Sequence, residues 1–190
     1  MPRILGTLLA AVLLTGLAVD SASAFDEAAI KSLAPDQAMQ VPDGNCGTLE
    51  LKVKSVATIV DSDSTWYAVT TATKNGEERT LFIDFPKGVG EVDLSIKKVR
   101  LRDLNVRRQD LEKMDDRGKG NLTFNGQEYD YVDSDDAHYK EKGANTDISY
   151  YEFASKADDD DGLMIFQMDD NEFDVFVTTS IDASAVTIVK

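Results

Sequence analysis

The sequence has few of the residues that carry metal binding and nucleophilic chemistry. It contains one cysteine, Cys46, and one histidine, His138, so it cannot form an internal disulfide or supply the three or four His and Cys ligands of a zinc site. A Cys–His nucleophile pair would need a third, orienting group, and no motif marks one. The glycine pairs in KGVG and RGKG do not form a phosphate-binding loop that opens a helix. We therefore predict no catalytic residue, no cofactor and a non-enzymatic protein.

Long apolar runs are absent after residue 24. The first 24 residues combine a basic start, MPR, an apolar run over residues 4–19 and the small residues of ASA at 22–24. This pattern predicts a secretory signal peptide that is cleaved after Ala24, and the apolar run is short for an uncleaved membrane anchor. We expect a periplasmic or secreted protein with no membrane insertion after signal cleavage.

The charge is strongly of one sign. The chain has 20 Lys and Arg against 35 Asp and Glu, a net charge of −15. Such a charge repels nucleic acids and anionic membranes, and it favours cations or basic partners. We expect no nucleic-acid partner. The protein or small-molecule ligand is not identified by composition.

After the signal peptide, a lead segment (25–46) precedes the first regular alternation. Ala29, Ile30 and Leu33 would form one face of a short helix that begins behind Asp26, and Pro35 would end it. The period of two in TLELKVK, from Thr48, then predicts a half-buried strand. Further strand patterns follow in TWYAVTTAT, TLFIDF and VDLSIK, and Asn75-Gly76 predicts a hairpin between the first two. VRLR alternates in the opposite phase, which predicts a bulge or turn near Lys97–Lys98.

The second half of the chain repeats the patterns of the first. GNLTF (120–124) matches GTLEL (47–51), YVDSDD matches IVDSDS, YYEF matches WYAV, and NEFDVFV matches GEVDLSI, with the order kept. The main length difference is AHYKEKGANTDIS, which we assign to a loop because loops tolerate insertions. We predict an all-β fold of about a dozen strands. It would consist of two tandem copies of a small curved antiparallel sheet or barrel-like unit (47–106 and 120–190), joined by a linker (107–119) with a short helical turn.

The matching Val-Asp-Ser-Asp segments have two interpretations. Both follow an apolar strand, so Asp and Ser would form turns by bonding to nearby backbone N–H groups. The metal alternative makes Asp61, Asp63, Asp133 and Asp135 calcium ligands. Neither segment has the glycine or the twelfth-position glutamate of an EF-hand loop. We favour the turns.

Two features are candidates for binding. The first is the pair of aromatic dipeptides Trp66–Tyr67 and Tyr150–Tyr151. Adjacent residues of a strand point to opposite faces, so one of each pair should be core. The other would be either a surface aromatic used in recognition or packed against the repeat partner or the lead segment.

The second candidate is the basic segment 97–108. We expect Arg100 and Arg102 on one face of a strand. They would either balance neighbouring carboxylates or bind the acidic residues 158–161 of a second copy in a weak, salt-dependent self-association.

WYAV, TLFID, LTFNGQEYDYVDSDDAHY, YYEF and NEFDVFV together resemble the bacterial domain of unknown function 4178 over residues 45–189. The resemblance implies a β-rich fold and a non-enzymatic role, and it supplies no ligand. Members of that family are not generally exported, so the predicted signal peptide departs from the family pattern. We therefore expect an exported, non-catalytic binding or interaction module. The alternatives are a calcium-responsive acidic binding protein and a hydrolase with an unrecognised carboxylate pair.

Overall fold

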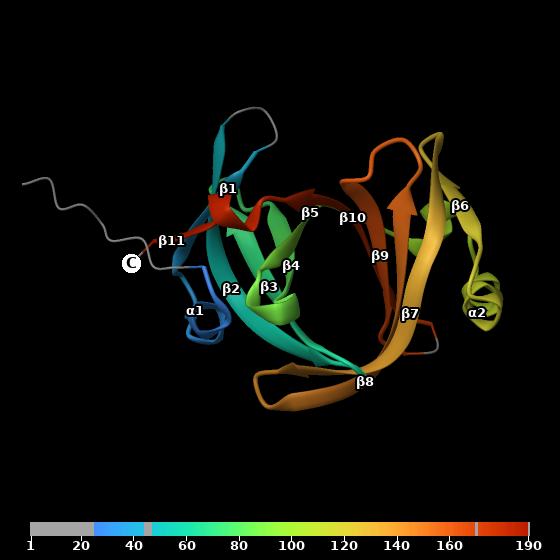
Figure 1. Ribbon diagram of the computed structural model, residues 1–190, viewed down its shortest axis with the longest axis horizontal. Coiled ribbons are helices and arrows are strands. Elements are labelled where there is room, and N and C mark those ends of the chain that lie inside the picture. The colour runs from blue at the N-terminus through green and yellow to red at the C-terminus, as the bar shows by residue number, and fades with distance from the viewer. Residues whose placement is uncertain (1–24, 44–46, 170, 190) are drawn as a thin grey trace, which may run out of the picture.

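The computed structural model describes residues 25–43, 47–169 and 171–189 (Figure 1). Within these residues, eleven antiparallel strands form one sheet. The strands are β1 (Ala38–Pro42), β2 (Thr48–Val60), β3 (Thr65–Thr73), β4 (Glu78–Asp84), β5 (Glu91–Val99), β6 (Asn121–Phe124), β7 (Gln127–Glu141), β8 (Ala144–Ser155), β9 (Asp161–Gln167), β10 (Phe173–Ile181) and β11 (Thr187–Val189). The helices are α1 (Glu27–Lys31) and α2 (Arg108–Arg117), with short 3-10 turns η1 (Pro86–Gly88), η2 (Leu101–Leu104) and η3 (Ala183–Ala185). The predicted signal peptide and Cys46 lie outside the described residues.

The sheet consists of two curved units joined edge to edge. Its strand order is β11-β1-β2-β3-β4-β5-β10-β9-β8-β7-β6, so β5 and β10 form the joint between the first half (β1–β5 and β11) and the second half (β6–β10). On the opposite side, β2 and β7 pair through three residues each, Thr58–Val60 with His138–Lys140. The second contact closes β2–β5 and β7–β10 into a ring (Figure 1). The prediction of an all-β fold built from two tandem curved units is confirmed.

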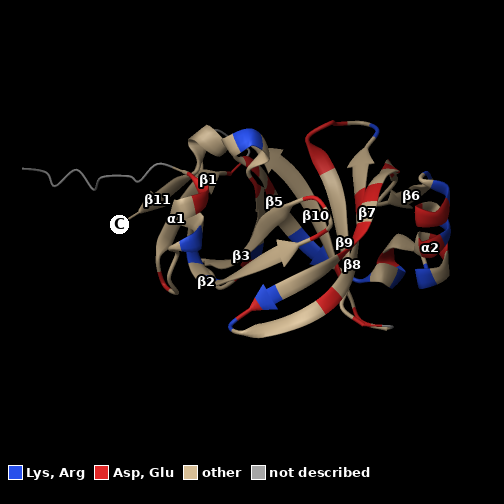
Figure 2. Ribbon diagram, turned by 60° about the horizontal axis from the view of Figure 1, so that its bottom comes forward, with Lys and Arg blue, Asp and Glu red and all other residues tan. Residues whose placement is uncertain are grey.

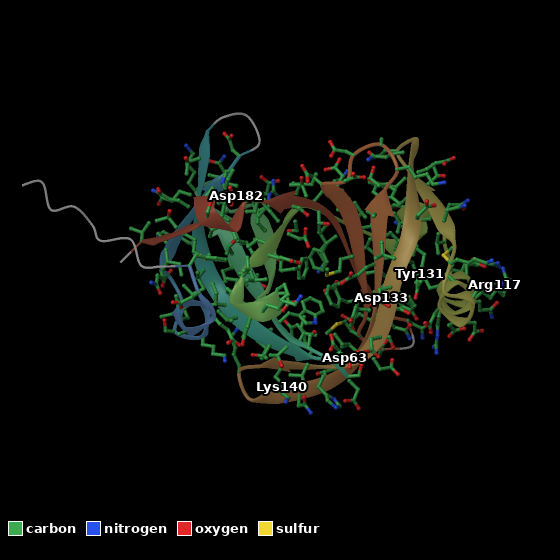
Figure 3. All side chains as sticks on the ribbon, in the orientation of Figure 1. Asp63, Arg117, Tyr131, Asp133, Lys140 and Asp182 are labelled. Carbon is green, nitrogen blue, oxygen red and sulfur yellow. The ribbon has the colours of Figure 1, made fainter. Side chains whose placement is uncertain are left out.

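Both faces of the central strands are buried, and this explains why their sequences are almost continuously apolar. In β3, Trp66 and Ala68 lie in a cluster that joins the two halves inside the ring, whereas Tyr67 and Val69 lie in the core of the first half. The second half has the same arrangement, with Tyr150 inside the ring and Tyr151 in the outer core. Side chains of both halves fill the space between them (Figure 3).

The elements at the ends of the chain cover the first half. Asp26 caps α1 by accepting a hydrogen bond from the backbone N–H of Ala29 at 2.8 Å, and Ile30 is fully buried, so the predicted N-terminal helix is confirmed. The sequence predicts no strand in the lead segment, but Ala38–Pro42 form β1. β1 pairs with both β2 and β11. Residues 182–189, which we grouped with the second copy, therefore return to the first half. Among the described helices, none has the length and apolar character needed to cross a bilayer.

The second Val-Asp-Ser-Asp segment is not a turn, and this corrects the sequence prediction. The first, Asp61–Ser64, does join β2 to β3, but Asp133–Asp135 lies within β7, beside a bulge between Tyr131 and Asp133. The residues assigned to a loop extend β7 and β8 into a long hairpin instead. Lys142 and Gly143, both with positive φ, form its tight turn. This extension carries the residues that pair with β2 and close the ring.

The strand predicted for Arg100 and Arg102 is also wrong. β5 has its bulge at Ile96, which has no partner between the pairs Lys97–Val177 and Ser95–Thr178, close to the predicted position. The strand then ends at Val99, and a 3-10 turn follows. The carboxylate of Asp103 accepts hydrogen bonds from the backbone N–H and the guanidinium of Arg100, and these bonds favour the turn over continued pairing.

Candidate functional site

The best candidate site lies at one end of the ring interior, where the two halves meet. A hollow of about 260 Å³ is lined there by five carboxylates together with Trp66, Tyr150, Phe82 and Met164. We call this hollow the acidic mouth. Its carboxylates belong to Asp61, Asp84, Glu91, Asp93 and Glu152. None of the described residues that line it is a lysine or an arginine.

Asp93 connects the acidic mouth to two neighbouring hollows. One, of about 140 Å³, is shared with Glu152 and with the acidic turn Asp159–Asp161. The other is an open groove of about 810 Å³ that runs towards η3 and is also lined by Glu91 and Asp182. The described lining of these two hollows contains no basic side chain either. The negative region is thus continuous around Asp93.

Asp61 is fully engaged in holding the two halves together. Its Oδ1 accepts hydrogen bonds from the backbone N–H groups of Asp63 (2.9 Å) and Ser64 (2.6 Å). Its Oδ2 accepts from the Ser64 hydroxyl (2.9 Å), the Trp66 indole (3.2 Å) and the Tyr150 hydroxyl (3.2 Å). Burial acts to raise the pKa of Asp61, but these donors outweigh it and the pKa is lowered. Asp61 is therefore an ionised structural residue.

Glu152 and Asp93 have a different environment, because no cation accompanies them among the residues that line the hollow. Burial, which is the largest cause, and the charges of Asp93, Asp133, Asp61 and Asp84 together raise the pKa of Glu152 to about 7. Burial also raises the pKa of Asp93, against the effect of the Ser180 hydroxyl, which donates to its Oδ1 at 2.6 Å. The mouth contains carboxylates whose negative charge is only partly compensated by the protein.

The aromatic dipeptides are buried, so the surface-aromatic alternative is excluded. Trp66, Tyr67, Tyr150 and Tyr151 are between 1% and 7% exposed. Trp66 and Tyr150 pack edge to face across the two halves, with their ring centroids 5.4 Å apart. The Tyr67 hydroxyl donates to Glu27 of α1 at 2.6 Å. These contacts match the other alternative: Trp66 and Tyr150 pack against the repeat partner, and Tyr67 contacts the lead segment. Trp66 and Tyr150 nevertheless form part of the wall of the acidic mouth.

The four metal candidates do not converge on one point. Asp61 is engaged as described, and Asp135 accepts a hydrogen bond from the Ser62 hydroxyl at 2.7 Å, which links the two Val-Asp-Ser-Asp segments across the ring closure. Asp63 is exposed near the ring closure, and Asp133 lies on β7 (Figure 3). Over residues 25–43, 47–169 and 171–189, no group of three or more His, Cys, Asp or Glu side chains is arranged to hold a metal ion.

No residue of the basic segment lines the acidic mouth, and most of its arginines pair with nearby carboxylates. Arg100 and Asp103 form a two-point ion pair, with N···O distances of 3.1 and 3.2 Å. Arg102 lies 3.9 Å from the same carboxylate and is 71% exposed. Basic and acidic residues likewise mix along α2 (Figure 2). The charge of Arg100 is balanced by Asp103, so Arg100 does not belong to a free basic patch. The Arg102 side chain remains accessible.

Comparison with known proteins identifies the family. A family model described as Domain of unknown function (DUF4178) matches residues 44–183. The chain belongs to that family. The match confirms the resemblance seen in the sequence, and it covers both halves of the ring. Searches of the curated proteins and of the solved structures found no match. The family assignment brings no ligand or reaction with it, so the function has to be argued from the site.

Sequence reasoning missed Glu152 and Asp93 as site residues. A usable signal was present in the repeat alignment. YYEF aligned with WYAV places Glu152 opposite Ala68, so a buried small residue in one copy corresponds to a carboxylate in the other. An ionisable residue at a core position of a strand is uncommon unless it has a partner or a function. The abundance of acidic residues concealed this substitution.

Proposed function

We propose that the protein is an exported, non-catalytic binding module whose acidic mouth holds a positively charged ligand. The observation that carries the proposal is the acidic mouth itself: five carboxylates and three aromatic side chains of the ring interior meet there, with no basic residue in the described lining. A carboxylate that is partly removed from water without a positively charged partner lowers the free energy of unfolding, and a bound cation offsets this loss. Concave, partly apolar pockets with a few converging polar groups are also the usual form of a ligand site.

The hydrolase alternative has one supporting observation, because the mouth holds carboxylates in contrasting environments. The pKa of Asp61 is lowered and that of Glu152 is raised to about 7, as in acid–base pairs of enzymes. However, both oxygens of Asp61 are occupied by five protein donors. A nucleophile or general base needs an available lone pair directed at the substrate. We therefore place binding before hydrolysis.

The calcium-responsive alternative needs oxygen ligands that converge. Calcium takes six to eight oxygen ligands, and the described residues supply no preformed cluster of three. A calcium effect would then come from weak screening of the negative surface. Magnesium would produce a similar effect by the same mechanism.

Thermal melting of the chain from Phe25 onwards tests the proposal. The unfolding temperature is measured at constant ionic strength with alkylammonium, guanidinium, calcium or magnesium ions, and with neutral alcohols and amides of similar size. We expect at least one organic cation to raise it, since a ligand that binds only the folded state stabilises that state. We expect Glu152→Gln and Asp93→Asn to reduce the rise in unfolding temperature. Glu50→Gln, a substitution of an exposed residue, should leave that rise unchanged. Equal shifts from cations and their neutral counterparts would contradict the proposal.

Export is a separate part of the proposal. Fractionation of cells that express the full chain, followed by mass determination of the exported product, should give a mature N-terminus at Phe25. Retention of the first 24 residues on a membrane-bound product would support the uncleaved-anchor alternative instead.

A further inference from the structure

At the end of the ring interior opposite the acidic mouth, residues of both halves surround an ammonium group that belongs to the protein's own Lys98. The Nζ of Lys98 on β5 lies 2.7 Å from Oδ1 of Asp174 on β10. The same Nζ lies 5.4 Å from the centroid of the Phe176 ring, within the range of a cation–π contact. All three residues line a small hollow of about 100 Å³ at the other end of the ring interior. This end thus combines an aromatic wall, a carboxylate and an ammonium group.

Asp93 is the counterpart of Asp174 in the first half. Glu91-Val92-Asp93 and Glu172-Phe173-Asp174 match in the repeat alignment, and the two segments lie on the adjacent antiparallel strands β5 and β10. Two further pairs of aligned residues also line opposite hollows, one member of each pair at each end. Glu152 and Met164 line the acidic mouth, whereas their counterparts Ala68 and Thr80 line the opposite hollow. The two ends of the ring interior are therefore equivalent positions of the repeat.

The equivalent lysine is missing at the acidic mouth. On β5 and β10, Lys98 pairs with Phe176, and the aligned counterpart of Phe176 is Ser95, whose partner is Thr178. Thr178 therefore stands where an equivalent of Lys98 would be, and it lines the adjoining hollow that shares Asp93 and Glu152 with the acidic mouth. The same end of the ring has gained Glu152 in place of Ala68. The described lining of the acidic mouth thus has five carboxylates and no cationic side chain, whereas the opposite hollow is lined by two carboxylates, Glu78 and Asp174, together with Lys98.

We propose that the acidic mouth binds an aliphatic primary ammonium group, which takes beside Asp93 the place that the Lys98 ammonium takes beside Asp174. This inference rests on the proposed function and names its ligand class. Asp93 and Glu152 accept hydrogen bonds from the ammonium, which has three N–H donors. Trp66, Phe82 and Met164 contact the attached methylene chain, and the aromatic faces favour the cation. The group is carried by a free amine or by a lysine side chain of another protein.

The shape of the site favours ammonium over other cations. A compact point charge fits between carboxylates that come from different strands, whereas a planar guanidinium is best matched by a single carboxylate in a two-point contact. Asp61 is not available for such a contact, because both of its oxygens already accept protein donors. A divalent metal ion would need a closer cluster than the described side chains provide.

Fluorescence of Trp66 tests the inference, because Trp66 is the single tryptophan of the chain and lines the mouth. The chain from Phe25 onwards is titrated at constant ionic strength with n-butylammonium, tetramethylammonium, guanidinium and butanol. We expect a saturable response to n-butylammonium with an affinity at least about tenfold above that for tetramethylammonium, which has the charge but no N–H donor. Asp93→Asn and Glu152→Gln should each weaken n-butylammonium binding by about tenfold. Glu50→Gln, which changes an exposed carboxylate outside the mouth, should leave it unchanged.

A parallel titration with Nα-acetyl-lysine-N-methylamide distinguishes the two sources of the group. Binding equal to or tighter than that of n-butylammonium supports a lysine side chain, and exclusion of the lysine derivative supports a free amine. Equal affinity for tetramethylammonium, or n-butylammonium binding that Asp93→Asn does not weaken, would overturn the inference. Tighter binding of guanidinium would overturn it too, while leaving the proposed function intact. The proposed function itself fails if no organic cation raises the unfolding temperature more than its neutral counterpart does.

Discussion

The hydroxyl of Tyr150 donates a hydrogen bond to Oδ2 of Asp61, 3.2 Å away, and this bond ties the second half of the ring to the β2–β3 turn of the first. The same oxygen accepts from the Trp66 indole, so one carboxylate fixes two aromatic side chains that belong to corresponding positions of the repeat. The relationship positions the wall of the acidic mouth. It also makes Asp61 a residue of stability rather than of ligand binding.

Asp61→Ala should strongly destabilise the protein. Loss of a partly buried acceptor leaves several donors without a partner, and we expect the free energy of unfolding to fall by about 3 kcal/mol in urea denaturation. Asp63→Ala in the same turn removes an exposed carboxylate and should change it by less than about 0.5 kcal/mol. Similar losses of unfolding free energy in the two variants would show that the hydrogen bonds of Asp61 do not hold the two halves together.

Glu152 makes stability fall as the pH rises. The folded protein retains the proton of Glu152 up to a pKa of about 7, above the ordinary value of 4.5, so between these values the folded state binds more protons than the unfolded state. The cost grows from about pH 4.5 to about pH 7 and is constant above. Glu152→Gln should therefore stabilise the ligand-free protein by up to about 3 kcal/mol at pH 8 and have little effect at pH 4.5. Urea denaturation at both pH values, with Glu50→Gln as the control, measures this; equal effects at the two pH values would contradict it.

Lys98→Ala should create a second ammonium site at the opposite end of the ring. The substitution leaves Asp174 without its partner, lowers the unfolding temperature and opens space next to Phe176. We expect n-butylammonium to restore part of the lost stability, and tetramethylammonium to restore less. No selective rescue by n-butylammonium would argue against the equivalence of the two ends.

Self-association through the basic segment stays a proposal, and Arg102 is the arginine whose substitution tests it. Arg102 is more exposed than the carboxylate nearest to it, whereas Arg100 is held by Asp103. Any association with the acidic turn at residues 158–161 should weaken as the Debye length falls from about 10 Å at 0.1 M salt to about 3 Å at 1 M. Sedimentation at the two salt concentrations should show this loss of association. Arg102→Glu should weaken the association more than Lys74→Glu does. A monomer under every condition would end the proposal.

The sequence was sufficient to predict the elements whose local patterns and burial agree. Alternation in TLELKVK and the composition of TWYAVTTAT predicted β2 and β3 because their side chains meet a core on a period of two. Asp26 similarly predicted the start of α1, whereas the helix ends at Lys31, before the predicted stop at Pro35. The repeat alignment predicted two curved units, because corresponding strands must bury corresponding faces.

Long-range contacts explain what the sequence did not predict. The sequence around Lys142-Gly143 is polar and predicts a loop, but its residues form two strands that pair with each other, and β7 also pairs with β2 at the ring closure. Arg100 ended β5 because Asp103 offers its backbone a local alternative. The acidic mouth brings together Asp61, Asp93 and Glu152 from the first and second halves, and no local spacing of carboxylates could indicate that convergence. In a chain with 35 acidic residues, only the fold distinguishes these carboxylates from solvated ones.

The most direct test of the central claim is a chemical-shift map of the ¹⁵N-labelled chain from Phe25 onwards during addition of n-butylammonium at constant ionic strength. We expect the largest shifts on the Trp66 indole N–H and on the backbone amides of Asp93 and Glu152. These signals should move much less with tetramethylammonium and not at all with butanol. Shifts spread evenly over the acidic surface, or concentrated on the β8–β9 turn while Trp66, Asp93 and Glu152 stay unchanged, would contradict the account.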